Sequence, residues 1–135
     1  MRPPPGAAGG HEIDSKTLAV TCARVAEEKK GRDVVVREVG GILRIADYFV
    51  IVTGGSRRQL RSIAEEIDRR VRDEEGSRGR IEGLTSEWWV LLDLGPVVVH
   101  VFSEEARRHY DLDLLWADAP VIAWESPASR SASVP

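Results

Sequence analysis

The stretch Tyr48-Phe49-Val50-Ile51-Val52-Thr53-Gly54-Gly55-Ser56 decides the fold, because a strand pattern changes there into a helix pattern. Its first six residues are apolar on both faces, which is typical of a strand in the middle of a sheet. The two glycines break the strand, and apolar side chains then recur at helical spacing. This helical stripe consists of Leu60, Ile63, Ala64, Ile67 and Val71. A buried strand followed by a long helix and more strands predicts an α/β crossover unit.

The long helix has clear start and stop signals. Ser56 and Gln59 form the S-x-x-Q pattern of a capping box, and Gly76 is placed to end the helix. The polar positions carry six Arg and six Asp or Glu residues, which is typical of a face in water. Upstream, Ser15 can cap a first helix that ends at Gly31, and residues 34–39 form a β-branched run that predicts a strand.

Downstream, residues 88–94 and 97–102 predict two strands joined tightly around Gly95-Pro96. Directly opposed residues of an antiparallel pair share a face, so a loop of two or four residues sorts this hairpin into two faces. A three-residue loop would break the sorting. One face is wholly aliphatic and is expected to pack against helices: Val90, Leu92, Leu94, Val97, Val99 and Val101. The other face mixes aromatic, acidic and imidazole groups: Trp89, Leu91, Asp93, Val98, His100 and Phe102.

After the hairpin, Ser103 is placed to cap a third helix with Glu104 and Glu105 in its first turn. A further apolar turn follows at residues 112–116, and residues 121–124 form a short apolar coda after Pro120. The sequence therefore predicts one α/β domain over residues 15–125, with a mixed sheet of four to five strands flanked by helices. Residues 1–14 and 126–135 are rich in Pro, Gly, Ala and Ser and predict disordered tails.

Composition narrows the class of protein. The chain has 135 residues, and Cys22 is its one cysteine, so neither a disulfide framework nor a cysteine-based zinc cluster is expected. No apolar run approaches the roughly 20 residues of a membrane span. The N-terminus lacks the apolar core of a signal peptide. We therefore expect a cytoplasmic protein that does not insert into a membrane.

The charge of the chain is unevenly distributed. Residues 80–125 hold three basic and nine acidic residues, a net charge of −6, whereas the rest of the chain has a net charge of +3. An acidic half suits a basic protein partner, because complementary potential speeds encounter and disfavours wrong partners. It does not suit a protein that mainly grips nucleic acid, so we expect no direct sequence-specific nucleic-acid binding. A surface that is acidic only for solubility remains an equal alternative.

No catalytic constellation is apparent, which predicts a binding module rather than an enzyme. His100 and His109 have no Cys or His at zinc-ligand spacing, and Asp111-x-Asp113 lies in a helical or turn pattern. We expect no metal and no cofactor. The alternative is a nucleotidyltransferase-like nucleotide-binding protein, since backbone N–H groups of the turn at 54–56 could hold phosphate. The acids that follow, at 65, 66 and 68, lie on the helix instead of a strand, which counts against magnesium chemistry.

Two residues of the mixed face have competing interpretations. Tryptophan is over-represented among the residues that dominate interfaces, which favours Trp89 as a binding anchor. Plain core packing explains Trp89 equally well. For His100, a satisfied and partly buried histidine is favoured over a catalytic or metal-binding role.

Several stretches together resemble one family. They are Asp47 to Ile51 followed by Thr53-Gly54-Gly55-Ser56, Glu82-Gly83 before Trp89 to Asp93, Val98 to Phe102, and Arg107-x-x-Tyr110-Asp111-Leu112-x-x-Leu115-Trp116-Ala117-Asp118-Ala119-Pro120. In order and spacing, over residues 15–122, this is similar to the ribosomal silencing factors, the Iojap-like family. The chain departs from the pattern at Ala46 and Gly55, where Thr is common, at Pro96, where an acid is usual, and at Asp113, where Glu is usual.

The resemblance implies a function that the residues alone do not. Members of the family bind the large ribosomal subunit through its protein L-fourteen, block association with the small subunit and so repress translation. They are typically homodimers, with a nucleotidyltransferase-like topology that lacks the active site. The expected partner-binding residues are Trp89, Leu91, Asp93, Val98, His100, Phe102, Arg107, Tyr110, Leu115 and Trp116.

Overall fold

The computed structural model describes residues 14–42, 45–76 and 79–125. The two predicted tails lie outside these residues, apart from Asp14. A six-stranded mixed sheet forms the centre of the fold, in the order β3-β4-β5-β2-β1-β6. Strands β2 (Tyr48–Gly54) and β5 (Val97–Ser103) are parallel neighbours, and every other pairing is antiparallel. The predicted single-domain α/β fold with a mixed sheet is confirmed, with one strand more than the four to five expected.

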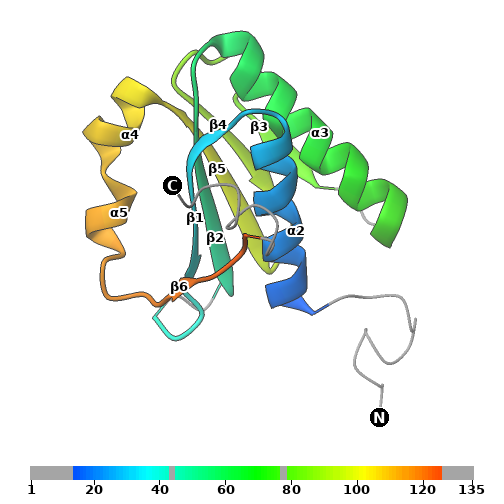
Figure 1. Cartoon of the computed structure of the whole chain (residues 1–135), viewed down its shortest axis with the longest axis vertical. Coiled ribbons are helices and arrows are strands. Elements are labelled where there is room, and N and C mark those ends of the chain that lie inside the picture. Colours follow the sequence, from blue (N-terminus) through cyan, green and yellow to red (C-terminus); the bar gives the residue numbers. More distant parts are fainter. Residues whose placement is uncertain (1–13, 43–44, 77–78, 126–135) are drawn as a thin grey trace, which may run out of the picture.

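Two long helices cover one side of the sheet, and two short helices lie on the other (Figure 1). Helix α2 (Ser15–Glu28) and helix α3 (Arg57–Glu75) pack against the aliphatic face. Helices α4 (Glu104–Tyr110) and α5 (Leu112–Leu115) follow β5 and lie on the opposite side. The sheet therefore separates a region with long helical cover from a region with short helical cover.

The crossover from β2 through α3 forms as the sequence predicts. Every residue of β2 is buried, as expected for a central strand. Ser56 caps α3 by accepting from the Gln59 N–H at 3.1 Å, and Gly76 ends it with φ +73°. The Gln59 side chain reaches back to the N–H of Gly55 at 2.6 Å, which completes a capping box displaced by one residue.

The start of the first helix differs from the prediction. Asp14, instead of Ser15, is the N-cap of α2, and its carboxylate accepts from the Thr17 N–H at 2.8 Å. That hydrogen bond is the main cause that lowers the pKa of the Asp14 carboxyl. Ser15 is the first helical residue, and its hydroxyl donates to Asp47 at 2.8 Å. Neighbouring Asp and Ser are both good N-caps, so the sequence alone does not choose between them.

The hairpin of β4 (Trp89–Asp93) and β5 has a two-residue loop, one of the two loop lengths that allow the predicted sorting. Leu94 donates to the Val97 carbonyl at 2.9 Å across Gly95-Pro96, and Gly95 has φ +91°. In this register Trp89 lies opposite Phe102, and Leu91 lies opposite His100. The predicted sorting into an aliphatic face and a mixed face is therefore confirmed.

Two edge strands were not predicted, and β1 (Arg32–Glu38) begins two residues earlier than expected. Strand β3 (Arg80–Glu82) pairs with β4, and β6 (Val121–Ile122) pairs with β1. Part of the apolar segment 121–124 thus forms an edge strand of the sheet, next to β1. Trp124 supports it, because its indole N–H donates to the Val34 carbonyl at 3.0 Å and its side chain is buried.

Candidate functional site

The mixed face of the sheet carries a second, smaller hydrophobic cluster. Its buried residues are Val39, Ala46, Phe49, Ile51, Phe102, Ala106 and Ala119. Trp89, Val98, Leu112 and Trp116 are partly buried and pack against it. The two short helices α4 and α5, which together make about three helical turns, cover this cluster. The cover is incomplete, so apolar and aromatic side chains at its edge remain in contact with solvent.

Trp89 is the centre of an aromatic group that runs from the core to the surface. Its ring centroid lies 5.1 Å from that of Phe102 and 5.0 Å from that of Tyr110. Phe102 is fully buried, Trp89 is partly buried, and Tyr110 is 46% exposed. The structure shows the packing of Trp89 against the buried Phe102, and because the ring is only partly buried its role as a binding anchor stays a prediction.

His100 lies beneath this aromatic group and is 5% exposed. Its Nδ1 accepts from the indole N–H of Trp89 at 3.2 Å, and the His100 ring meets that of Phe49 edge-on at 4.6 Å. Burial lowers the pKa of His100 to about 4, so the ring is neutral at pH 7 and Nε2 carries the proton. The Nε2 atom is buried without a hydrogen-bond partner in the described residues. The histidine therefore orients Trp89 and is not placed to contact a partner.

Arg107 joins three parts of the chain beneath the short helices. Its guanidinium pairs with Asp113 at 2.9 Å and 3.2 Å. It also donates to the Asp33 carbonyl at 2.7 Å and to the Thr53 hydroxyl at 3.0 Å. The side chain is only 14% exposed. Arg107 therefore holds α4 and α5 against the ends of β1 and β2, and its donors are used within the fold.

An open hollow of about 580 Å³ lies beside Trp89. It is lined by Gly83, Ser86, Trp88, Trp89, His109 and Tyr110. The Ser86 hydroxyl accepts from the backbone N–H groups of Trp88 and Trp89, at 2.9 Å and 3.1 Å, which fixes the start of β4. Gly83 has φ +84°, and a Cβ there would lie 2.6 Å from the Trp89 carbonyl oxygen. The Glu82-Gly83 turn therefore allows the close approach that shapes one wall of the hollow.

The predicted residues divide into three groups by exposure. Tyr110 and Leu115, at 46% and 70% exposed, are on the surface. Trp89, Leu91, Asp93, Val98, Arg107 and Trp116 are partly buried, whereas His100 and Phe102 are buried. Asp93 has a local task, since its carboxylate accepts from the Gly95 N–H at 2.8 Å in the hairpin loop. The structure brings Trp89, His100, Phe102 and Tyr110 together, while Leu115 lies on α5.

Three surface residues were missed by the sequence analysis. Trp88 is 46% exposed and Leu114 is 72% exposed, and His109 stacks edge-on against Tyr110 at 5.0 Å. Trp88 lies inside the predicted strand 88–94, but β4 begins at Trp89, so Trp88 does not follow the alternation of the strand and is exposed. Leu114 and Leu115 lie on the short helix α5, which has no fully buried residue, and of that helix only Leu112 packs against the smaller cluster.

The turn that suggested nucleotide binding is occupied by its own side chains. The Gly55 N–H is bound by Gln59, and a Cβ on Gly54 would lie 2.7 Å from the Leu60 side chain. The acids that follow on α3 are also engaged: Glu65 with Arg61, Glu66 with Arg69 and Arg70, and Asp68 with Arg72 and the Gly79 N–H. This turn is therefore a structural strand-to-helix connection.

Within residues 14–42, 45–76 and 79–125, no group of three or more His, Cys, Asp or Glu residues is arranged to hold a metal ion. None of the helices in this described part is both long and apolar enough to cross a membrane.

Comparison with known proteins identifies the family. Residues 12–134 match the family model described as ribosomal silencing factor during starvation. The chain belongs to the ribosomal silencing factor family. It is 39% identical over 118 residues to a ribosomal silencing factor of Halalkalibacterium halodurans, covering 87% of this chain and all of that protein. It is also 39% identical to the silencing factor of Bacillus subtilis, over 81% of this chain and 92% of that protein. The chloroplastic protein Iojap of Zea mays is 28% identical, over 89% of this chain and 52% of that protein.

Solved structures of relatives have the same fold. A crystal structure from Bacillus halodurans matches with a TM-score of 0.68 and 37% identity, covering 80% of this chain and 98% of that one. A crystal structure from Chromobacterium violaceum matches with a TM-score of 0.73 and 28% identity, covering 78% and 88%. The resemblance noted in the motifs of this silencing-factor chain is therefore confirmed.

Proposed function

We propose that this chain binds the large ribosomal subunit through ribosomal protein L-fourteen and sterically blocks association with the small subunit. The observation that carries the proposal is the aromatic hollow on the incompletely covered side of the sheet. Together with the exposed leucines of α5 it forms the contact surface, defined here by Trp88, Trp89, His109, Tyr110, Leu114 and Leu115.

The contact surface has the composition of a binding site. Aromatic residues are enriched at interfaces, and a few such anchors supply most of the binding energy. Trp89 is held in one orientation by His100, so little conformational entropy is lost when a partner packs against it. The surrounding half of the chain is acidic, which favours a basic ribosomal protein.

Silencing by this route requires occupancy and affinity, and it requires no chemical reaction. A bound domain that overlaps the small-subunit surface prevents joining for as long as it stays bound. We therefore propose a regulatory factor of the cytoplasm that is not an enzyme and uses no cofactor. The engagement of the turn at 54–56 by Gln59 and Leu60 supports this choice over the nucleotidyltransferase alternative.

The test is a sucrose-gradient assay of subunit joining with purified subunits. Added protein is expected to reduce the joined ribosome and to co-sediment with the large subunit. Tyr110→Ala is expected to lose this effect, and Lys16→Ala, an exposed truncation on α2, is expected to keep it. Unchanged joining in the presence of the native chain contradicts the proposal.

We also propose that the free protein is a homodimer. The support is a group of exposed apolar side chains near the end of the domain, since Leu114, Leu115 and Val121 are 72%, 70% and 63% exposed, and exposed apolar patches often mark protein interfaces. Sedimentation equilibrium should give twice the mass of one chain. A single-chain mass at all accessible concentrations contradicts the dimer and leaves the ribosome proposal intact.

A further inference from the structure

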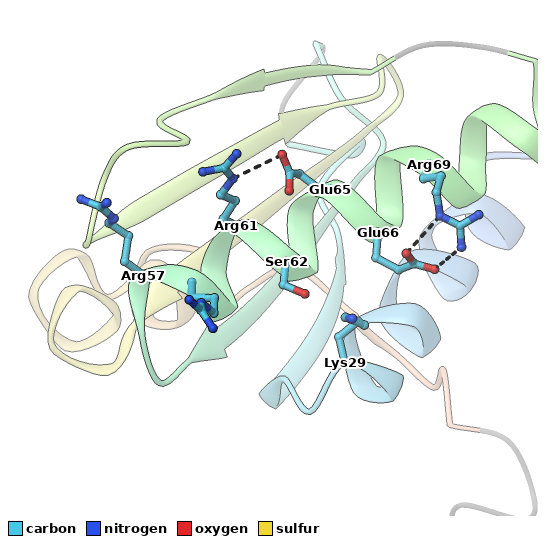
Figure 2. Close-up of a pocket in the computed structure, with 8 residues that line it drawn as sticks. Lys29, Arg57, Arg61, Ser62, Glu65, Glu66 and Arg69 are labelled. Atoms are coloured by element: carbon cyan, nitrogen blue, oxygen red, sulfur yellow. Dashed lines mark hydrogen bonds and ion pairs between the residues drawn. The ribbon is translucent and has the colours of Figure 1, made fainter.

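A groove of about 540 Å³ follows helix α3 on the side of the sheet away from the contact surface. Its lining residues are Lys29, Arg57, Arg58, Arg61, Ser62, Glu65, Glu66 and Arg69. Figure 2 shows Lys29, from the end of α2, facing the same groove as Ser62 and Glu66 of α3. A second hollow of about 300 Å³ shares Lys29, Arg58 and Ser62 with the first and adds Glu28, Lys30, Ser56 and Gln59. We name this continuous surface the basic groove.

The acids of the basic groove are already neutralised, and several of its cations are not. Glu65 pairs with Arg61, Glu66 pairs with Arg69 at 2.6 Å and with Arg70 at 3.3 Å, and Glu28 pairs with Arg70 at 3.0 Å. The hydrogen bond from Arg69 is the main cause that lowers the pKa of the Glu66 carboxyl. By contrast, Lys29, Lys30, Arg57 and Arg58 have no carboxylate partner among the described residues.

The frame that carries these cations is fixed. The Gln59 side-chain amide donates to the carbonyl oxygens of Lys29 and Lys30, at 3.2 Å and 3.0 Å. This ties the end of α2 to the first turn of α3. Leu60 and Ile63, on the buried face of the same turn of α3, are fully buried in the larger core. The positive charges therefore project from a rigid corner between two helices.

We propose that the basic groove binds the phosphate backbone of large-subunit ribosomal RNA. Phosphates are the ligands that clustered, unpaired Lys and Arg side chains favour. From Arg57 to Arg69 the helix advances about 18 Å, room for several successive phosphates. The lining contains no aromatic side chain on which a base could stack, so the contact is to the backbone and is independent of sequence.

This contact is distinct from the one to L-fourteen, because the sheet separates the two surfaces (Figure 1). Both can be occupied by one molecule at once. The local charge also differs from that of the acidic half, so the uneven distribution of charge in the sequence acquires a structural meaning. Only the identification of the RNA as ribosomal rests on the proposed function.

The test is fluorescence anisotropy with a labelled oligouridine of about 20 nucleotides and with a ribosomal RNA hairpin, between about 50 and 200 mM salt. The native chain is expected to bind both probes with a salt-dependent affinity. Arg57→Ala/Arg58→Ala is expected to flatten the logarithmic salt slope for the single strand by about 1.4, which is about 0.7 per lost phosphate contact. The matched control is Arg80→Ala/Arg108→Ala, which removes the same charge from exposed positions on β3 and α4.

Two results overturn the inference. One is the absence of RNA binding by the native chain up to about 100 µM at the lower salt concentration. The other is an equal loss of affinity in the groove variant and the control, which would mean a diffuse charge effect. Binding of each variant to isolated L-fourteen is measured in parallel. Absence of L-fourteen binding by the native chain defeats the proposed function, whereas absence of RNA binding by a native chain that does bind L-fourteen defeats the basic groove alone.

Discussion

The two sides of the sheet share the same strands but are covered differently. On the aliphatic side, α2 and α3 cover a large cluster of buried residues, and their outer surfaces are charged. On the mixed side, α4 and α5 bury a smaller aromatic cluster and leave Tyr110, Leu114 and Leu115 exposed. We therefore expect the first side to supply most of the stability, and we propose the second side as the protein-binding surface.

The largest effect is expected from a cavity on the aliphatic side. Leu92, on β4, is fully buried in the larger hydrophobic cluster beneath the long helices. Leu92→Ala should lower the free energy of unfolding by about 2–5 kcal/mol, from lost transfer energy and the cavity left behind. Urea unfolding followed by circular dichroism measures this. A loss below about 1 kcal/mol would mean that this side is not the stabilising one.

The next effect is a pH dependence on the mixed side. The unfolded pKa of His100 is near 6.5 and the folded pKa is about 4, so in that window the unfolded chain binds a proton that the folded chain does not. The stability contributed is complete above pH 6.5 and falls as the pH drops toward 4, by about 2–3 kcal/mol. His100→Gln should flatten this part of the stability profile.

The control for His100 is His109→Gln, at an exposed position on α4. It is expected to leave the acid slope of the stability profile unchanged. Equal slopes for the native chain and His100→Gln would show that His100 is accessible to water in the folded state. The division of the mixed side into buried residues, such as His100 and Phe102, and exposed residues, such as Tyr110, would then be wrong.

A smaller effect is expected where the short helices are fastened. Arg107→Ala removes the contacts to Asp113, Asp33 and Thr53 and should cost about 2 kcal/mol of stability. Hydrogen exchange of α5 should become faster than in the native chain. Arg108→Ala, one residue along and 70% exposed, is expected to change stability by less than about 0.5 kcal/mol. Similar losses of stability in both variants would contradict the role of Arg107 in holding α4 and α5 against β1 and β2.

The smallest effect on folding is expected where the effect on binding is largest. Tyr110→Ala should change the free energy of unfolding by less than about 1 kcal/mol, because the ring is half exposed. It should weaken binding to L-fourteen about tenfold or more, as truncation of an aromatic anchor does. Calorimetric titration measures the affinity. Loss of folding would instead place Tyr110 in the core and remove the distinction between the two sides.

Local patterns predicted most of the fold. Strand alternation separated Val90 and Leu92 from Trp89 and Leu91, and the structure keeps that separation. The change from strand to helix at Ser56 also appears where the capping pattern placed it. These features depend on residues close together in the chain, which is why the sequence alone sufficed.

The missed features depend on distant parts of the chain. Strands β3 and β6 are three and two residues long and exist only because β4 and β1 offer an edge for pairing. The exposure of each side chain in the site also depends on contacts between distant parts of the chain. Alternation placed His100 and Phe102 on the mixed face, but only the tertiary arrangement shows that both are buried beneath Trp89 and the short helices.

Hydrogen–deuterium exchange of the chain with and without purified L-fourteen tests the central claim most directly. The contact surface on α4 and α5 predicts slower exchange over residues 104–116 and at the start of β4 when L-fourteen is bound, with α2 and α3 unchanged. Protection confined to α2 and α3, with residues 104–116 unaffected, would contradict the assignment of protein binding to the mixed side.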